Sequence, residues 1–233
     1  MPVVPELSVR RSFLGRLAAG AAVFGTAIAT GSSPLQAMAE REVYKPIRHP
    51  MDDWFDAIPG KHRIFFDAVS ATGAGGALGF ANNFAVANKS GYGLDANQLA
   101  RVICYRHFAT CFAFTDAMWQ KYGPIWGGLM GFNDPKSNAA PVRNVWNATD
   151  LPGMQPNLGN PISMLVADGV HFAVCDMATH FIAGASAEKA GSTADAIYAE
   201  LKANVIGNSH FVPAGIVAVN RAQERGYTFS YVG

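Results

Sequence analysis

The stretch Asp168-Gly169-Val170-His171-Phe172-Ala173-Val174-Cys175-Asp176 decides the predicted fold. It is a short apolar run that opens with the turn dipeptide Asp-Gly and contains β-branched and aromatic residues, which is typical of a buried strand. A pattern compatible with a helix follows at once, from Met177 to Lys189. Because a strand that leads directly into a helix is half of a β-α-β unit, the stretch predicts an α/β protein.

Cys175 closes this predicted strand and is the first candidate site residue. In open α/β sheets, ligands bind at the carboxyl ends of the strands. Side chains alternate along a strand, so His171 is expected on the same face as Cys175 and is a second candidate. The competing interpretation is that Cys175 is a small core residue, which is the more common role of a lone cysteine on an apolar strand.

The rest of the chain repeats the alternation of strand and helix patterns. Strands are predicted at 62–69, 99–108, 211–212 and 227–232, with a further short one at 140–146, and helices at 51–58, 74–89, 114–122, 160–167, 194–204 and 213–225. This order predicts a three-layer α/β sandwich with a mostly parallel sheet of about five strands and helices on both faces.

The N-terminal residues predict an export signal. Arg10-Arg11-Ser12-Phe13-Leu14 is a twin-arginine motif, an apolar region follows at 17–30, and Ala37-Met38-Ala39 offers a small-x-small cleavage site. The alternative is a membrane anchor, but the apolar run is short and is diluted by Gly and Thr. We therefore predict cleavage after Ala39 and a periplasmic or otherwise exported protein.

The predicted organisation has three parts. Residues 1–39 are the signal peptide, 40–60 an N-terminal arm, and 61–233 one α/β domain with an irregular insertion near 123–156, where Gly, Pro and Asn are dense. With 50% apolar and 15% charged residues, the chain can build a sizeable core and shows little sign of disorder.

Charge argues against several classes of partner. The formal net charge is +1, and the predicted signal contributes three arginines and one glutamate, so the remainder is also close to neutral. A near-neutral chain without basic clusters is not expected to bind nucleic acid or an anionic membrane as its main partner. No later segment is long and apolar enough to predict stable membrane insertion after signal cleavage.

Cysteine and glycine patterns argue against common cofactors. The three cysteines are Cys104, Cys111 and Cys175, and no Cys-x-x-Cys pair exists, which weighs against thioredoxin-type chemistry and structural zinc. A disulfide between Cys104 and Cys111 is not expected, because Cys111 lies just beyond the strand that holds Cys104. The glycine-rich stretch 70–76 has neither dinucleotide nor Walker spacing and is interpreted as a tight strand-to-helix connection. No cofactor is predicted.

Histidines supply the remaining candidates. Arg106 and His107 stand near the carboxyl end of the second predicted strand, where they are either part of a site or a solvated strand end. A metal site of imidazole and thiolate ligands, suited to zinc or copper, is a further hypothesis. Its weak candidates are His107, His171, His180 and His210, together with Cys175. The alternative is that these histidines are scattered, because no pair has the spacing of a strong metal motif.

Two blocks of the chain carry a resemblance to a known family. The first is Gly169-Val170-x-x-x-Val174-Cys175 followed by an Ala-rich helix, and the second is Val212-Pro213-Ala214-Gly215-Ile216-Val217 with Gln223-x-x-Gly226-Tyr227. They resemble the cysteine segment and the closing helix and strand of the DsrE/DsrF-like sulfur-relay proteins, which include YchN- and TusD-like proteins. Asn82-Asn83 is a weaker similarity.

The resemblance implies a compact α/β sandwich that forms homo-oligomers, with Cys175 accepting sulfur as a persulfide. The thiolate is the nucleophile in such a step. The implied partners are further copies of the chain and a small-molecule or protein sulfur donor. The alternative is a non-catalytic oligomeric module of the same fold that binds a small molecule or a protein, because fold does not set function. In that case aromatic residues in and around the irregular insertion would anchor an interface, namely Trp119, Trp126, Phe132 and Trp146.

Overall fold

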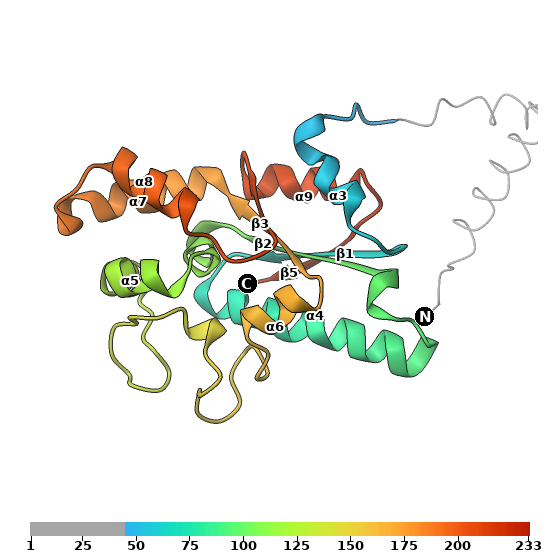
Figure 1. Ribbon diagram of the computed structural model, residues 1–233, viewed down its shortest axis with the longest axis horizontal. Helices are drawn as coiled ribbons and strands as arrows, with labels where there is room; N and C mark the ends of the chain where they lie inside the picture. Colours follow the sequence, from blue (N-terminus) through green and yellow to red (C-terminus); the bar gives the residue numbers. More distant parts are fainter. Residues whose placement is uncertain (1–44) are drawn as a thin grey trace, which may run out of the picture. The chain divides into compact units, whose positions relative to one another are not determined.

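The computed structural model describes residues 45–233, and residues 48–233 form one compact unit (Figure 1). The predicted signal peptide and its cleavage site therefore lie outside the described residues. Within the described part, the predicted arm contains two short helical segments, Pro50–Asp52 and Asp53–Ala57 (α3).

The centre of the unit is a five-stranded sheet in the order β4-β3-β2-β1-β5, and every neighbouring pair is parallel. The strands are β1 (His62–Ala68), β2 (Leu99–Tyr105), β3 (His171–Cys175), β4 (Ser209–Val212) and β5 (Thr228–Val232). Because all five strands are parallel, all their carboxyl ends lie at the same edge. The predicted α/β sandwich is confirmed.

Helices cover both faces of this sheet. The longer ones are α4 (Ala71–Tyr92), α5 (Asp116–Met130), α6 (Ile162–Ala167), α7 (Asp176–Ala190), α8 (Ala194–Ala203) and α9 (Gly215–Gln223), and 3₁₀ segments lie at Ala96–Gln98, His107–Ala113 (η4) and Val145–Asn147 (η5). Figure 1 shows α3 and α9 on one side of the sheet and α4 and α6 on the other. α7 and α8 pack against each other, and α7 also contacts α5 and η4.

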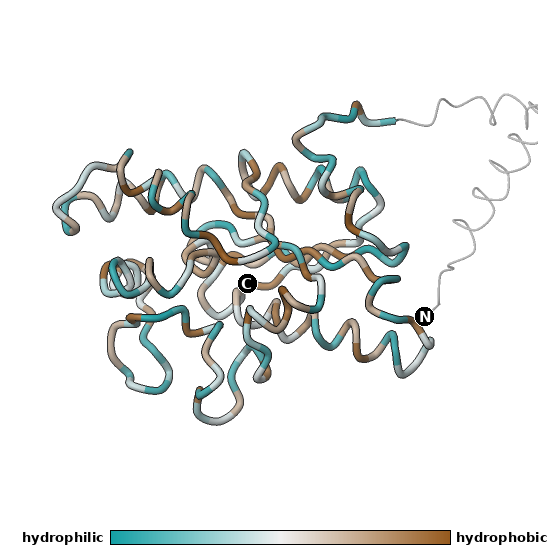
Figure 2. The backbone as a smooth tube through the Cα atoms, viewed as in Figure 1, coloured by the Kyte–Doolittle hydropathy of each residue, from teal (hydrophilic) through white to brown (hydrophobic). Residues whose placement is uncertain are grey.

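The strand order explains why α9 lies apart from the other crossover helices. From β1 to β4 the chain moves across the sheet in one direction, and it then returns past β1 to add β5. Parallel crossovers are right-handed, so a connection in the reverse direction must cover the opposite face. Two apolar cores result, one on each side of the sheet, and hydrophobic residues accordingly concentrate in the central strands (Figure 2).

The opening stretch folds as predicted and is fixed by a buried arginine. Gly169 has a φ of 78°, which a glycine adopts without strain. Arg101 on β2 is almost fully buried and donates from Nη2 to the carbonyl oxygen of Asp168 at 2.7 Å and to its carboxylate at 2.8 Å. These bonds hold the turn that precedes β3 against the neighbouring strand.

The helix predicted at 74–89 is longer than the sequence pattern indicated, because it also contains the glycine-rich stretch. Ser70 caps α4 by accepting a hydrogen bond from the N–H of Gly73, so the helix begins at Ala71. A Cβ placed on Gly75 would lie 3.0 Å from the ring of Trp146. The glycines therefore let another segment pack closely on the first turns of a helix, rather than forming a loop.

The prediction of a strand at 140–146 is wrong. This segment consists of bends and leads into η5, because Asn144 uses its side chain to bond two carbonyls, those of Phe112 and Phe114, instead of joining a ladder. Trp146 packs on α4 and donates from Nε1 to the carbonyl of Ala71 at 2.8 Å. The proposed aromatic interface anchors are also wrong in part, because Trp119, Trp126 and Trp146 are buried in the core.

Several predicted boundaries shift. β2 ends at Tyr105 rather than Phe108, because the chain turns into η4 at His107. The helix predicted at 114–122 begins at Asp116 and continues past Pro124 to Met130, so the first part of the predicted irregular insertion is helical. The helix predicted at 213–225 is the shorter α9. The helix predicted at 194–204 is confirmed as α8, with Thr193 accepting a cap bond from the N–H of Ala196.

Candidate functional site

Cys175 is the last residue of β3 and the residue that caps α7. Its Sγ accepts a hydrogen bond from the backbone N–H of Ala178 at 3.4 Å, and its carbonyl oxygen accepts one from Thr179 Oγ1 at 2.9 Å. Only 6% of the residue is exposed. The first N–H groups of a helix lack intrahelical acceptors and form the positive end of its dipole, so the sulfur of Cys175 lies beside backbone donors that the helix itself leaves unpaired.

The thiol lines a cavity of about 790 Å³ at the carboxyl edge of the sheet. The lining residues come from the segments after β1 and β2 and from the starts of α7 and α9: Val69, Arg106, His107, Phe108, Cys175, Met177, Ala178, Phe181, Ala214, Gly215 and Ile216. The volume lies within the range of small-molecule sites. Two helices therefore direct their N-terminal ends toward one cavity that contains a thiol.

Arg106 is held beside this cavity by a carboxylate on the neighbouring strand. It donates from Nε to Asp67 Oδ1 at 2.6 Å and from Nη2 to Asp67 Oδ2 at 2.8 Å. The hydrogen bond with Asp67 raises the pKa of Arg106 above its usual value. On its other side the arginine meets Gly215, where a Cβ would lie 2.5 Å from Arg106 Cβ. The guanidinium is thus held by a buried carboxylate, while the stem of the same side chain lies against the start of α9.

His107 lines the same cavity and has an unusual backbone. Its φ of 51° lies in the left-handed region, which residues other than glycine seldom adopt. Such conformations persist only where the surrounding structure enforces them, and they collect at functional sites. The structure therefore brings His107 and Cys175, two of the predicted site residues, to one cavity.

His171 lies at the other end of β3 and belongs to a different group of residues. Its Nδ1 is 2.9 Å from Nε2 of His210 on β4, and the His210 ring stacks on Trp54 of α3 with centroids 4.1 Å apart. Burial lowers the pKa of His171, and burial together with the neighbouring His171 lowers the pKa of His210 to about 4. The structure does not bring His171 to the thiol.

His180 lies apart from both groups. Its ring stacks on Tyr198 with centroids 3.8 Å apart, and Nε2 lies 3.8 Å from Asp176 Oδ2. The carboxylate of Asp176 also accepts hydrogen bonds from Tyr198 and Lys202. The four candidate histidines are therefore divided among three places, and residues 45–233 contain no group of three or more His, Cys, Asp or Glu side chains that could hold a metal ion.

No disulfide joins any of the three cysteines. The two others, Cys104 and Cys111, are buried. Burial is the largest cause that raises the pKa of Cys104 well above its ordinary value, and burial also raises the pKa of Cys111. Both are fully buried, whereas Cys175 reaches a cavity. Cys175 is thus the thiol that a reagent in solution can approach.

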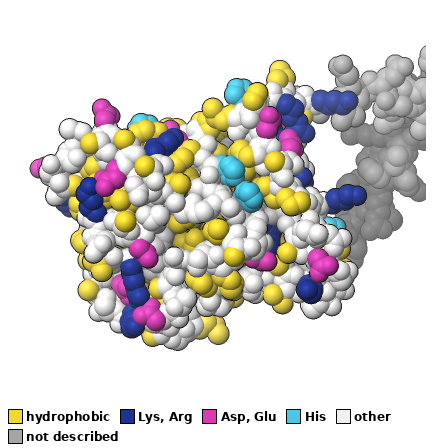
Figure 3. Space-filling view, viewed as in Figure 1, with side chains coloured by type: hydrophobic (Ala, Val, Ile, Leu, Met, Phe, Trp, Pro, Cys, Tyr) yellow, Lys and Arg dark blue, Asp and Glu magenta, His cyan; other side chains and the backbone are white. Residues whose placement is uncertain are grey.

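The mouth of the cavity is apolar. Met177, Phe181 and Ile216 are exposed by 68%, 58% and 61%, and Phe108 is partly exposed beside them. By contrast, on the face seen in Figure 3 the lysine and arginine side chains are scattered among acidic ones rather than gathered in one patch. The surroundings of the thiol are therefore suited to a ligand or partner with an apolar part.

The sequence prediction missed Asp67 and Gly215 as parts of this site. Asp67 directly follows the apolar run Ile64-Phe65-Phe66 in β1. A carboxylate in that position is the signal that could have paired it with a cation at the end of the next strand. Gly215 lies in the second block of the family resemblance, but its close approach to Arg106 is visible only in three dimensions.

Comparisons of the chain with protein-family models, with curated proteins and with solved structures found no match. Among the described residues, no helix combines the length and the apolar character needed to cross a membrane.

Proposed function

We propose that the protein is an exported sulfur carrier in which Cys175 receives a sulfur atom as a persulfide. The observation that carries the proposal is the position of the thiol: Cys175 Sγ caps α7 and lines a cavity of about 790 Å³. A carrier thiol must be reachable by its donor and must be stable as an anion, and both requirements agree with this position.

The proposed step needs no external oxidant. The Cys175 thiolate attacks the outer sulfur of a donor persulfide, R–S–SH, and forms a new S–S bond. The donor's own S–S bond breaks, and its electron pair leaves on R–S⁻. That thiolate takes the proton of the transferred sulfur and departs as R–SH, so Cys175 is left as a persulfide anion.

Two groups of this chain would support the step. Arg106 carries a positive charge beside the cavity, and its fixed pairing with Asp67 keeps it in place without a rearrangement when an anion forms. The first N–H groups of α9, at Gly215 and Ile216, border the cavity and add a second positive helix end. His107 lines the cavity, and we assign it the relay of that one proton from the transferred sulfur to the departing thiolate.

Mass spectrometry of the intact protein tests the proposal. After exposure to glutathione persulfide, the protein should gain one sulfur atom that dithiothreitol removes. The gain should be absent in Cys175→Ser and present in the matched control Cys111→Ser, because Cys111 is buried away from the cavity. An unchanged mass in a folded wild-type protein, or the same gain in Cys175→Ser, would contradict the proposal.

A second candidate function is a binding module without covalent chemistry. The exposed apolar mouth of the cavity, formed by Met177, Phe181 and Ile216, favours it, because apolar residues around a concave site are typical of ligand and protein docking. Saturable binding of an apolar ligand that is equal in wild type and Cys175→Ser, together with no sulfur uptake, would establish this alternative. Homo-oligomerisation is compatible with both functions and remains a proposal.

A further inference from the structure

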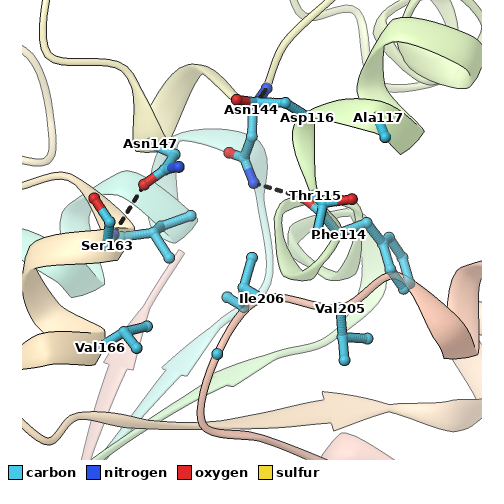
Figure 4. A pocket seen from close by; sticks show the side chains of 12 residues that line it. Phe114, Thr115, Asp116, Ala117, Asn144, Asn147, Ser163, Val166, Val205 and Ile206 are labelled. Carbon is cyan, nitrogen blue, oxygen red and sulfur yellow. Dashed lines mark hydrogen bonds between the residues drawn. The ribbon is translucent and has the colours of Figure 1, made fainter.

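A second cavity, of about 470 Å³, shares no residue with the one that contains Cys175 (Figure 4). It lies where the start of α5, the segment around η5, α6 and the turn before β4 meet. The residues that line it are Phe114, Thr115, Asp116, Ala117, Asn144, Asn147, Ile162, Ser163, Val166, Val205, Ile206 and Gly207.

Asn144 presents an acceptor to this cavity and no donor. Both hydrogens of its amide nitrogen are used, in bonds to the carbonyls of Phe112 at 2.8 Å and Phe114 at 2.9 Å. These bonds fix the orientation of the amide. Its Oδ1 is buried and has no hydrogen-bond partner within residues 45–233, although the residue is only 2% exposed. In Figure 4 the side chain points into the space between Ser163 and Thr115.

Thr115 supplies a second buried oxygen among the residues that line this cavity. Its Oγ1 also has no hydrogen-bond partner in the described part of the chain. Thr115 occupies the capping position of α5, but its side chain makes no capping bond, so the hydroxyl does not serve the helix. Buried polar atoms are nearly always paired, and two unpaired oxygens at one cavity point to a ligand that brings hydrogen-bond donors.

The charge of the cavity narrows the choice of ligand. Of the described residues that line it, Asp116 alone is charged. One of its carboxylate oxygens accepts a hydrogen bond from the backbone N–H of Asn144 at 2.7 Å, which leaves the other oxygen for a ligand. The opposite part of the lining is aliphatic and includes Ile162, Val166 and Val205. Anions are disfavoured here, whereas a cation with several donors and an aliphatic body matches both parts.

We propose that this cavity binds a small protonated primary amine with a short aliphatic chain. The ammonium group carries three donors and no acceptor, which matches Asn144 Oδ1, Thr115 Oγ1 and the Asp116 carboxylate. Hydrogen bonds from an ammonium to a carboxylate are stronger than those between neutral groups. The site is separate from the Cys175 cavity, so the proposal does not depend on the sulfur-carrier function.

Titration of the purified protein with n-butylammonium chloride at neutral pH, followed by ¹⁵N-¹H NMR and calorimetry, tests this site. We expect saturable binding, with shifts confined to residues 114–117, 144–147, 162–166 and 205–207. The neutral n-butanol should bind roughly tenfold more weakly, which corresponds to about 1.4 kcal/mol, and sodium butyrate should not bind. Binding should be unchanged in Cys175→Ser.

Two substitutions are designed to keep the fold. Asp116→Asn retains an acceptor for the Asn144 N–H but removes the charge, and Thr115→Val retains the β-branched shape but removes the hydroxyl. Asp116→Asn should weaken n-butylammonium binding roughly tenfold, as for the loss of one charge-assisted contact. Thr115→Val should weaken it by a smaller factor. Asp195→Asn is the matched control, because Asp195 also lies in the first turn of a helix but not at the cavity.

Four outcomes would overturn the proposal: no saturable binding, equal binding of n-butanol, unchanged affinity in folded Asp116→Asn, or shifts that lie outside the cavity.

Discussion

Asp67 and Arg106 bind each other through two parallel hydrogen bonds, of 2.6 and 2.8 Å, at the carboxyl ends of the neighbouring strands β1 and β2. Asp67 is almost fully buried, whereas the arginine reaches the cavity. The pair therefore links the interior of the sheet to the candidate site.

The first prediction concerns the cost of breaking this pair. Arg106→Met leaves the Asp67 carboxylate buried without a partner, which is expected to lower the free energy of unfolding by about 3–5 kcal/mol. The double variant Asp67→Asn/Arg106→Met should regain much of that loss, because no charge is then left unpaired. Urea unfolding of wild type, Asp67→Asn, Arg106→Met and the double variant gives the coupling energy between the two residues. Equal losses in the single and double variants would contradict this account.

The second prediction concerns thiol reactivity. In native protein, iodoacetamide should alkylate Cys175 alone, because Cys104 and Cys111 are buried and their pKa values are raised. Denatured protein should take up label at all three cysteines. Peptide mapping identifies the labelled positions, and native Cys175→Ser should take up essentially none. Comparable labelling of Cys104 in the native state would show that the interior beneath Arg106 is open.

The third prediction concerns pH. The folded pKa of His210 is lowered to about 4, against about 6.5 in an unfolded chain, so the unfolded state takes up its proton first as the pH falls. Stability is expected to be full above about pH 6.5, to decrease as the pH falls from there to about 4, and to level off below. Allowing for partial burial, the loss should be about 1–2 kcal/mol.

Urea unfolding of wild type and His210→Gln across this pH range measures the effect, and the variant should have a flatter profile. The tryptophan fluorescence of the folded variant should also differ from that of wild type, because the His210 ring stacks on Trp54. A profile in His210→Gln as steep as that of wild type would assign the pH dependence to other groups.

The fourth prediction compares two glycines of one helix. Gly75→Ala would place a Cβ 3.0 Å from the Trp146 ring and should destabilise the protein by about 1–3 kcal/mol through overpacking. Gly91→Ala meets nothing within 4 Å and should stabilise α4 by up to about 1 kcal/mol, because alanine favours the helix. Thermal unfolding shows whether Gly75→Ala lowers the melting temperature and Gly91→Ala raises it. A stabilising Gly75→Ala would mean that Trp146 can move aside at little cost.

The fifth prediction concerns export. Expressed in a bacterium with a twin-arginine pathway, the protein should appear in the periplasm with Glu40 as its first residue, since the sequence predicts cleavage after Ala39. Arg10→Lys/Arg11→Lys should abolish export, whereas the matched control Arg16→Lys should not. N-terminal sequencing of fractionated cells gives the answer, and export of the double variant would refute the motif.

The strands and most helices could be predicted because their local patterns agree with their tertiary environment. The run 168–176 is apolar, preceded by a turn and followed by a helix, and it forms β3 as its pattern indicates. The segment 140–146 could not be predicted in the same way. Its conformation depends on Asn144 bonding to carbonyls about thirty residues earlier and on Trp146 packing against a distant helix.

The candidate site was predictable only in part, for a geometric reason. Cys175 and His107 lie close to strand ends, and parallel strands bring their ends together, so strand order suffices to place them near each other. His171 shares a face with Cys175 but lies at the opposite end of the same strand, and face alone does not decide proximity. The fit of Arg106 between Asp67 and Gly215 depends on the packing of three separate elements.

The contact between Gly215 and Arg106 also constrains how the sequence can evolve. Any side chain at position 215 would collide with the Cβ, Cγ and Cδ atoms of Arg106, so a chain that inherits this site must keep a glycine there for as long as it keeps the arginine. Loss of the arginine would free the position to vary. Four residues are thus expected to be gained and lost together: an aspartate in the first strand, an arginine at the end of the second, a cysteine closing the third and a glycine opening the last helix. Their joint presence would mark distant relatives whose sequences have otherwise diverged.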